Sequence, residues 1–180
     1  MRLELSHIRQ PETEFNKVFQ PADLASGGEE YRVTAPVALG MAIHKDQDRF
    51  RLVGTVKTEL ELDCSRCLEP FKLPVDREFD LRYLPAGAVE PETDDDEETE
   101  VEDDDVAMTF YRDEQIDLNE LLREQFYLAL PMKPLCSAGC KGICPQCGTN
   151  RNTVPCDCNP QWEDTRMAGL KTLLKRNDDA

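Results

Sequence analysis

Residues 49–81 read RFRLVGTVKTELELDCSRCLEPFKLPVDREFDL, and this stretch decides the fold. In its first half one face recurs at every second position: Phe50, Leu52, Gly54, Val56, Thr58, Leu60 and Leu62. After the Cys64–Cys67 pair the alternation resumes with Phe71, Leu73, Val75, Arg77, Phe79 and Leu81. Because alternate side chains of a β-strand share one face, we predict two strands with one side buried.

The same alternation is present upstream, in Val33, Val37, Leu39, Met41 and Ile43. Pro36 lacks a backbone N–H, so it predicts that this strand lies at a sheet edge. A polar turn is expected at residues 44–48. Three alternating segments within residues 31–83 therefore predict an antiparallel β-meander.

One or two helices are expected to pack on this meander. Asp117 is a good N-cap, and an apolar stripe follows it: Leu118, Leu121, Leu122, Phe126 and Ala129. Pro131 should end this helix. A second amphipathic helix is expected over Glu163–Arg176. Strands and helices in separate parts of the chain indicate the α+β class.

The charge is concentrated in one short segment. Twelve of the sixteen residues 90–105 are Asp or Glu, whereas the whole chain has a net charge of −16. Such a segment has little apolar surface to bury, so we expect a disordered acidic loop that serves at least as a solvated spacer. It would separate a β-rich part (1–89) from a part with the helices and most cysteines (106–180), within one domain overall.

The eight cysteines predict metal binding. The first residues carry Arg2, Glu4 and Arg9, and no apolar run approaches the roughly twenty residues of a membrane helix, so we expect a cytoplasmic protein without a membrane partner. Thiols stay reduced in the cytosol, which disfavours disulfides. The pairs are Cys64–Cys67, Cys136–Cys140, Cys144–Cys147 and Cys156–Cys158. Closely spaced thiols can share one tetrahedral zinc ion.

Four pairs divide into two zinc sites. We prefer one site of Cys144, Cys147, Cys156 and Cys158, and a second of Cys64, Cys67, Cys136 and Cys140. The alternative joins Cys136, Cys140, Cys144 and Cys147 around one ion, although Cys140 and Cys144 are close in sequence for that. Gly148 after Cys147 suits a turn with positive φ. Four thiolates also bind iron.

No catalytic constellation accompanies these cysteines. His7 and His44 are the only histidines, and both are expected at the surface. A catalytic zinc keeps an open position and a nearby base, whereas all expected ligands here are thiolates. We therefore expect structural zinc, no small-molecule substrate and no enzymatic activity. A thiol redox sensor centred on Cys64 and Cys67 is an alternative.

Several segments together resemble the bacterial YceD family. They are Val53–Val56, Leu62–Phe71, Leu130–Cys136, Cys140–Gly148 and Asp164–Leu170; one departure is Asn150-Arg151-Asn152, where a leucine is expected between the asparagines. The resemblance covers nearly the whole chain except the acidic segment. It implies a YceD-like domain that acts in the accumulation of large-subunit ribosomal RNA, through its synthesis, processing or stability.

Two kinds of ribosomal partner follow from this resemblance. In the first, basic residues of the carboxy-terminal part contact phosphates of ribosomal RNA: Lys133, Lys141, Arg151, Arg166, Lys171, Lys175 and Arg176. The carboxy-terminal excess of positive charge is small, and an ordinary solvated surface explains it equally well. In the second, the acidic segment holds a basic ribosomal protein, and the chain is an interaction adaptor.

Overall fold

A six-stranded sheet is built around the long strand β5 (Arg49–Asp63). The computed structural model describes residues 1–24, 30–87 and 108–158. The expected acidic loop (90–105) and second helix (Glu163–Arg176) lie outside the described residues.

The predicted meander is confirmed. Strand β4 (Val37–Asp46) pairs antiparallel with β5, and β5 pairs antiparallel with β6 (Pro70–Pro85). The β4–β5 turn is shorter than expected, because Asp46 already pairs with Arg49. Gln47 takes a positive φ of 54° there, as tight hairpin turns require.

Three further strands extend the sheet to the order β2-β4-β5-β6-β7. Strand β2 (Glu12–Phe19) pairs antiparallel with β4, and β7 (Met108–Tyr111) pairs parallel with β6. The short β3 (Arg32–Val33) pairs with β5 beside this path. The edge position expected from Pro36 is therefore wrong: β4 lies between two strands, and Pro36 is tolerated because it precedes the first residue of β4.

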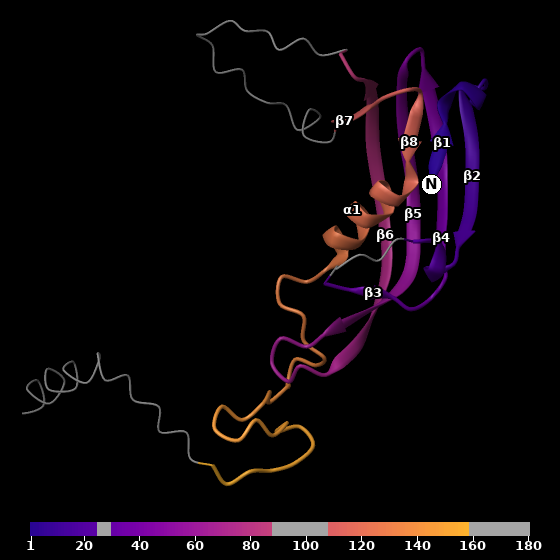
Figure 1. The fold of residues 1–180 in the computed structure, drawn as a ribbon. Helices are drawn as coiled ribbons and strands as arrows, with labels where there is room; N and C mark the ends of the chain where they lie inside the picture. The colour runs from indigo at the N-terminus through magenta and orange to yellow at the C-terminus, as the bar shows by residue number, and fades with distance from the viewer. Residues whose placement is uncertain (25–29, 88–107, 159–180) are drawn as a thin grey trace, which may run out of the picture. The chain divides into compact units, whose positions relative to one another are not determined.

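One helix and a small second sheet lie on one face of the large sheet (Figure 1). Strand β1 (Arg2–Glu4) pairs antiparallel with β8 (Gln115–Asp117), and α1 (Leu118–Ala129) follows β8 directly. The predicted N-cap is confirmed, since the Asp117 carboxylate accepts a hydrogen bond of 2.8 Å from the Asn119 backbone N–H. Short 3₁₀ turns occupy Leu5–His7 (η1) and Pro21–Asp23 (η2).

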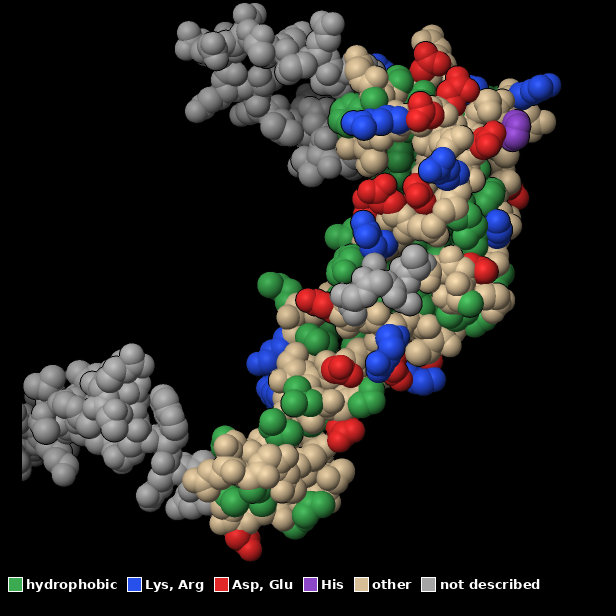
Figure 2. Space-filling model, in the orientation of Figure 1, with side chains coloured by type: hydrophobic (Ala, Val, Ile, Leu, Met, Phe, Trp, Pro, Cys, Tyr) green, Lys and Arg blue, Asp and Glu red, His purple; other side chains and the backbone are tan. Residues whose placement is uncertain are grey.

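The core lies between α1 and the inner sheet face. Four residues of the predicted helical stripe are buried in it, whereas the fifth, Ala129, is half-buried. The buried helical residues and the inner residues of the strands are Val37, Leu39, Met41, Ile43, Leu52, Val56, Leu60, Leu118, Leu121, Leu122 and Phe126. On the face of the molecule that Figure 2 shows, acidic and basic side chains are interspersed. The α+β class thus follows from one helix on a largely antiparallel sheet.

The chain forms two compact units. Met1–Cys64 and Glu69–Cys136 form the first, which contains every helix and strand named above. Ser65–Leu68 and Ser137–Ala180 form the second, which is described as far as residue 158 and contains turns and an antiparallel bridge between Ile143 and Asn150. Among the described residues, no helix has the length and apolar character needed to span a membrane.

Candidate metal centre

The eight thiols lie in two groups of four. In each group the sulfur atoms lie within 4.8 Å of one another: Cys64, Cys67, Cys136 and Cys140 in one, and Cys144, Cys147, Cys156 and Cys158 in the other. A tetrahedral zinc ion with bonds of about 2.3 Å would place its sulfurs about 3.8 Å apart, so both groups have the size of a single-ion site. The grouping is the one preferred from the sequence, and it separates Cys140 from Cys144. Metal binding itself stays a prediction.

The turn between β5 and β6 presents the first cysteine pair. Cys64 directly follows β5, and its backbone N–H donates to the Glu69 carbonyl at 3.0 Å, just before β6 begins. Leu68, the residue after Cys67, has a φ of 61°. This left-handed conformation is uncommon for a residue with a Cβ, and it turns the chain back toward β6.

Cys144 and Cys147 lie in a turn of the same design. The Cys144 N–H donates to the Thr149 carbonyl at 2.8 Å, again to the residue five positions on, and the Gly148 N–H donates to the Cys144 carbonyl at 2.9 Å. The expected positive φ of Gly148 is confirmed at 71°. Two Cys-x-x-Cys turns with this geometry each aim two sulfurs in one direction, as a tetrahedral metal site requires.

Arg66 connects the first turn to the segment that contains Cys140. Its guanidinium donates to the Cys140 carbonyl at 2.9 Å, and its own carbonyl accepts the Ile143 N–H at 2.9 Å. Gly142 allows this approach, because a Cβ built at its position would lie 2.9 Å from the Arg66 oxygen. Sequence reasoning missed Arg66, since its partners are backbone groups more than seventy positions away.

Asn152 contacts a sulfur of the first group. Its side-chain N–H₂ donates to Cys140 Sγ at 3.3 Å, and its Oδ1 accepts the Lys141 backbone N–H at 2.8 Å. Asn150 fixes this orientation by accepting from the Asn152 side chain at 2.9 Å. A hydrogen bond to sulfur stabilises the thiolate that a metal ion needs, so Asn152 has a supporting role at the site. The Asn-x-Asn pattern after Gly148 was the available signal.

Hydrogen bonds shift the thiol pKa values in the group of Cys144, Cys147, Cys156 and Cys158. The Thr149 hydroxyl, 3.3 Å from Cys147 Sγ, together with the Thr149 N–H lowers the pKa of Cys147 to about 6. The backbone N–H groups of Cys147 and Gln146 lower the pKa of Cys144. The pKa of Cys158 is raised to about 11, chiefly by its contact with Cys147. Four adjacent thiols therefore resist full ionisation without a cation, and a bound divalent ion would remove that repulsion.

Every ligand that the two thiol groups offer is a sulfur atom. Neither thiol group includes a histidine or carboxylate among the described residues. Both histidines are remote from the thiols in sequence, and His7 is exposed. Four sulfurs complete the coordination of zinc and leave no position for a substrate.

The structure describes only part of the expected RNA-contact set. Lys133, Lys141 and Arg151 are exposed. The other expected contacts lie outside the described residues: Arg166, Lys171, Lys175 and Arg176. RNA contact by any of the seven stays a prediction.

Comparison with known proteins gives one family. The family model described as "Large ribosomal RNA subunit accumulation protein YceD" matches residues 52–174, a span that includes all eight cysteines. No solved structure matches the chain significantly.

Relatives of the chain occur in plants and bacteria. The chloroplastic "Large ribosomal RNA subunit accumulation protein YCED homolog 1" of Zea mays is 29% identical over 96% of this chain and 64% of its own length. The chloroplastic homolog 1 of Arabidopsis thaliana is 28% identical over 82% of this chain and 51% of its own length. The uncharacterized protein YlbN of Bacillus subtilis is 26% identical over 98% of this chain and 96% of its own length. The chain thus spans between half and two thirds of the plant relatives' length.

Proposed function

Because the chain belongs to the YceD family of large ribosomal RNA subunit accumulation proteins, we propose that it is a non-enzymatic accessory factor in the accumulation of that RNA and in ribosome assembly. We further propose that its cysteines hold two structural zinc ions. The family match supports the role in RNA accumulation, and the two complete groups of four converging thiols within the matched span support the zinc ions.

Zinc would organise the cysteine-rich segments. The residues around Cys144–Cys147 contain turns and one bridge, with little apolar surface to hold them together. A four-thiolate zinc site supplies that stability directly, because the ion binds the folded arrangement and not the unfolded chain. Backbone N–H groups and Asn152 would disperse the net charge of −2 that each such site carries.

Elemental analysis of natively purified protein tests the zinc proposal. We expect two zinc ions per chain, and one ion after either Cys67→Ser or Cys144→Ser, because each removes a ligand from a different group. Ser137→Ala, which lies between Cys136 and Cys140, is the matched control and should keep both ions. A reduced, metal-free protein with an intact Ile143–Asn150 bridge in its NMR spectrum would contradict the proposal.

Depletion of the protein in cells that encode it tests the role in RNA accumulation. We expect the ratio of large-subunit to small-subunit ribosomal RNA to fall, and the native chain, but not the double variant Cys67→Ser/Cys144→Ser, to restore it. An unchanged ratio after complete depletion would refute the proposed role.

The charge balance favours a basic protein over RNA as the direct partner. The net charge of −16 counts thiols as neutral, and two four-thiolate zinc sites would make it more negative. A polyanion gains little by approaching RNA phosphates, but it attracts cationic proteins over long distances. We therefore place a basic ribosomal protein first among the partners.

One deletion and one set of charge reversals distinguish a protein partner from an RNA partner. Removing residues 90–105 should weaken the retention of basic ribosomal proteins in a pull-down, increasingly so at low salt. Replacing Lys133, Lys141 and Arg151 with Glu should leave that retention unchanged. The opposite result, in which the three substitutions alone abolish binding to precursor ribosomal RNA, would favour direct RNA contact.

A further inference from the structure

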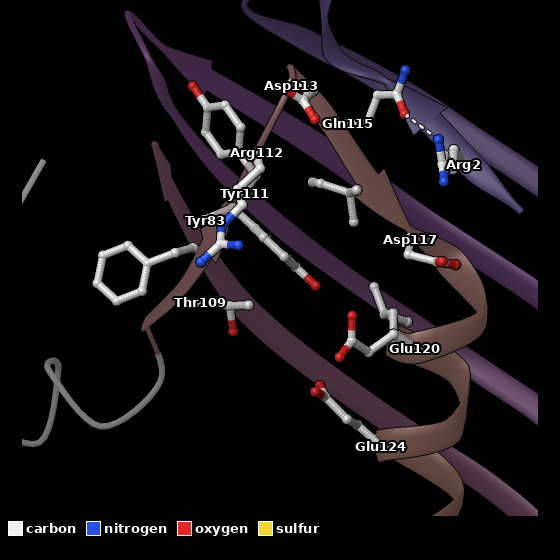
Figure 3. A pocket seen from close by; sticks show the side chains of 13 residues that line it. Arg2, Tyr83, Thr109, Tyr111, Arg112, Asp113, Gln115, Asp117, Glu120 and Glu124 are labelled. Carbon is white, nitrogen blue, oxygen red and sulfur yellow. Dashed lines mark hydrogen bonds between the residues drawn. The ribbon is translucent and has the colours of Figure 1, made fainter. Parts of the chain in front are cut away.

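A pocket of about 540 Å³ lies beside α1 in the first unit. Figure 3 shows its walls: Glu120 and Glu124 project from α1, and Tyr83, Thr109 and Arg112 come from the β6 and β7 side. None of these residues belongs to the thiol groups. The pocket therefore has no role in the proposed metal centre.

The two glutamates lie one helical turn apart on one face of α1. Like charges at this spacing destabilise a helix. Neither glutamate forms an ion pair within 4 Å among the described residues. Both glutamates are exposed at the edge of the pocket. Partial desolvation, followed by the Glu120 charge, raises the pKa of Glu124. Arg123 acts in the opposite sense on Glu124, and Arg2 and Arg112 line the pocket, but none of these cations pairs with either glutamate within 4 Å.

Tyr83 adds a buried polar group to the same pocket. The residue is 5% exposed, and its hydroxyl points into the space beside Glu120 (Figure 3). In the described part of the chain, this hydroxyl has no hydrogen-bond partner. The hydroxyl oxygen is not sealed from solvent, so it is available to hydrogen-bond a polar occupant of the pocket.

The remaining charged residues of the lining narrow the choice of occupant. The Asp117 carboxylate caps α1, and Arg2 donates to Gln115 at 3.2 Å. Arg112 lies on the wall opposite the glutamates and forms no ion pair within 4 Å among the described residues. The described carboxylates also bring no three oxygen ligands together as a metal ion requires. An extended organic cation fits better than a divalent ion.

We propose that this pocket binds one arginine side chain of a basic polypeptide. The guanidinium presents five donors in a planar fork, so it can reach two carboxylates one turn apart and the Tyr83 oxygen together. Phe110, which is 50% exposed, also lines the pocket, so an aromatic ring is available beside the guanidinium. The twelve acidic residues between β6 and β7 attach to strands that line the pocket and would steer a cationic partner toward it.

This inference deepens the proposed function, on which it rests for the kind of partner, a basic ribosomal protein. NMR titration of the full-length protein with N-acetyl-L-argininamide tests it. We expect the amide signals of Glu120, Glu124 and Tyr83 to shift, and Glu120→Gln/Glu124→Gln to weaken binding at least tenfold. Tyr83→Phe should weaken it about threefold, the loss of one hydrogen bond. N-acetyl-L-norleucinamide, which has no cation, should give no shift.

Glu12→Gln/Glu14→Gln is the matched control, because it removes two exposed charges from β2 outside the pocket. This variant should bind the probe as the native chain does. Equal binding by the Glu120/Glu124 variant, or shifts confined to the acidic segment 90–105, would overturn the proposal. Zinc content and the ribosomal RNA ratio are measured separately, so a failed titration leaves the proposed function standing.

Discussion

Three glycines near the thiols allow the turn geometry to be tested by one substitution each. Gly148 and Gly142 both have a φ of 71°, whereas Gly139 lies outside the positive-φ region. A Cβ at Gly148 or Gly139 would meet no atom within 4 Å, but at Gly142 it would lie 2.9 Å from the Arg66 carbonyl oxygen. Replacing each with alanine thus separates backbone strain from steric conflict.

The expected costs follow from these contacts. Gly139→Ala should change stability by less than about 0.5 kcal/mol, as for an ordinary surface substitution. Gly148→Ala forces a Cβ into the left-handed region and should cost about 1–2 kcal/mol, or about five- to thirtyfold in the zinc dissociation constant. Gly142→Ala adds a steric conflict of about 1–3 kcal/mol and should cost about 2–5 kcal/mol in total.

Competition against a chromophoric chelator, in reducing and oxygen-free buffer, measures these constants for each ion. Gly148→Ala should weaken the binding of the zinc ion held by the group that contains Cys147. Gly142→Ala should weaken mainly the binding of the zinc ion held by the group that contains Cys140. Native affinity in Gly148→Ala, or a Gly142→Ala variant no weaker than Gly148→Ala, would refute the reasoning.

Three further predictions concern the first unit. Leu122→Ala, at a residue that is 0% exposed, should lower the free energy of unfolding by about 2–5 kcal/mol in urea titrations, whereas Val18→Ser at an exposed position should change it little. Asp117→Ala should cost about 1 kcal/mol in thermal unfolding through the lost N-cap, and Asp117→Asn should retain most of it. The hydrogen bond from Arg51 lowers the pKa of Asp80, so this pair stabilises the fold above the ordinary pKa of 3.8 and loses its effect as the pH falls below that value. Arg51→Gln should therefore cost a few tenths of a kcal/mol at pH 7 but nothing near pH 2.

The parts of the fold with a strong local pattern could be predicted, and the parts set by tertiary pairing could not. The meander and α1 follow from long, largely apolar periods. The sequence did not indicate strand β2, because its alternation of apolar and polar residues is broken. Lys17 shares a face with the buried Phe19 and lies over its ring, while Val18 on the other face is 60% exposed. Strands β1 and β8 contain three residues each, too few to show a period.

The candidate site divides in the same way. The four cysteine pairs and the turn glycine at residue 148 are visible as spacing, because thiols that are to share one metal ion must recur at short intervals. Leu68 gives no such signal, since its positive φ occurs at a residue type that rarely adopts it. Tyr83 belongs to an alternating strand, so its pattern predicts burial and says nothing of the unpartnered hydroxyl.

The parallel pairing of β6 and β7 has a consequence for evolution and engineering. Pro85, the last residue of β6, pairs with Tyr111, and Met108, the first residue of β7, pairs with Arg82. The connection between the strands must therefore lead from the end of β6 back by the length of the four-residue β7. A parallel crossover needs about a dozen residues, whereas twenty-two separate the two strands. Topology therefore leaves part of this connection free to lengthen, shorten or be replaced by a reporter sequence, and natural selection can adjust its acidity without disturbing the sheet.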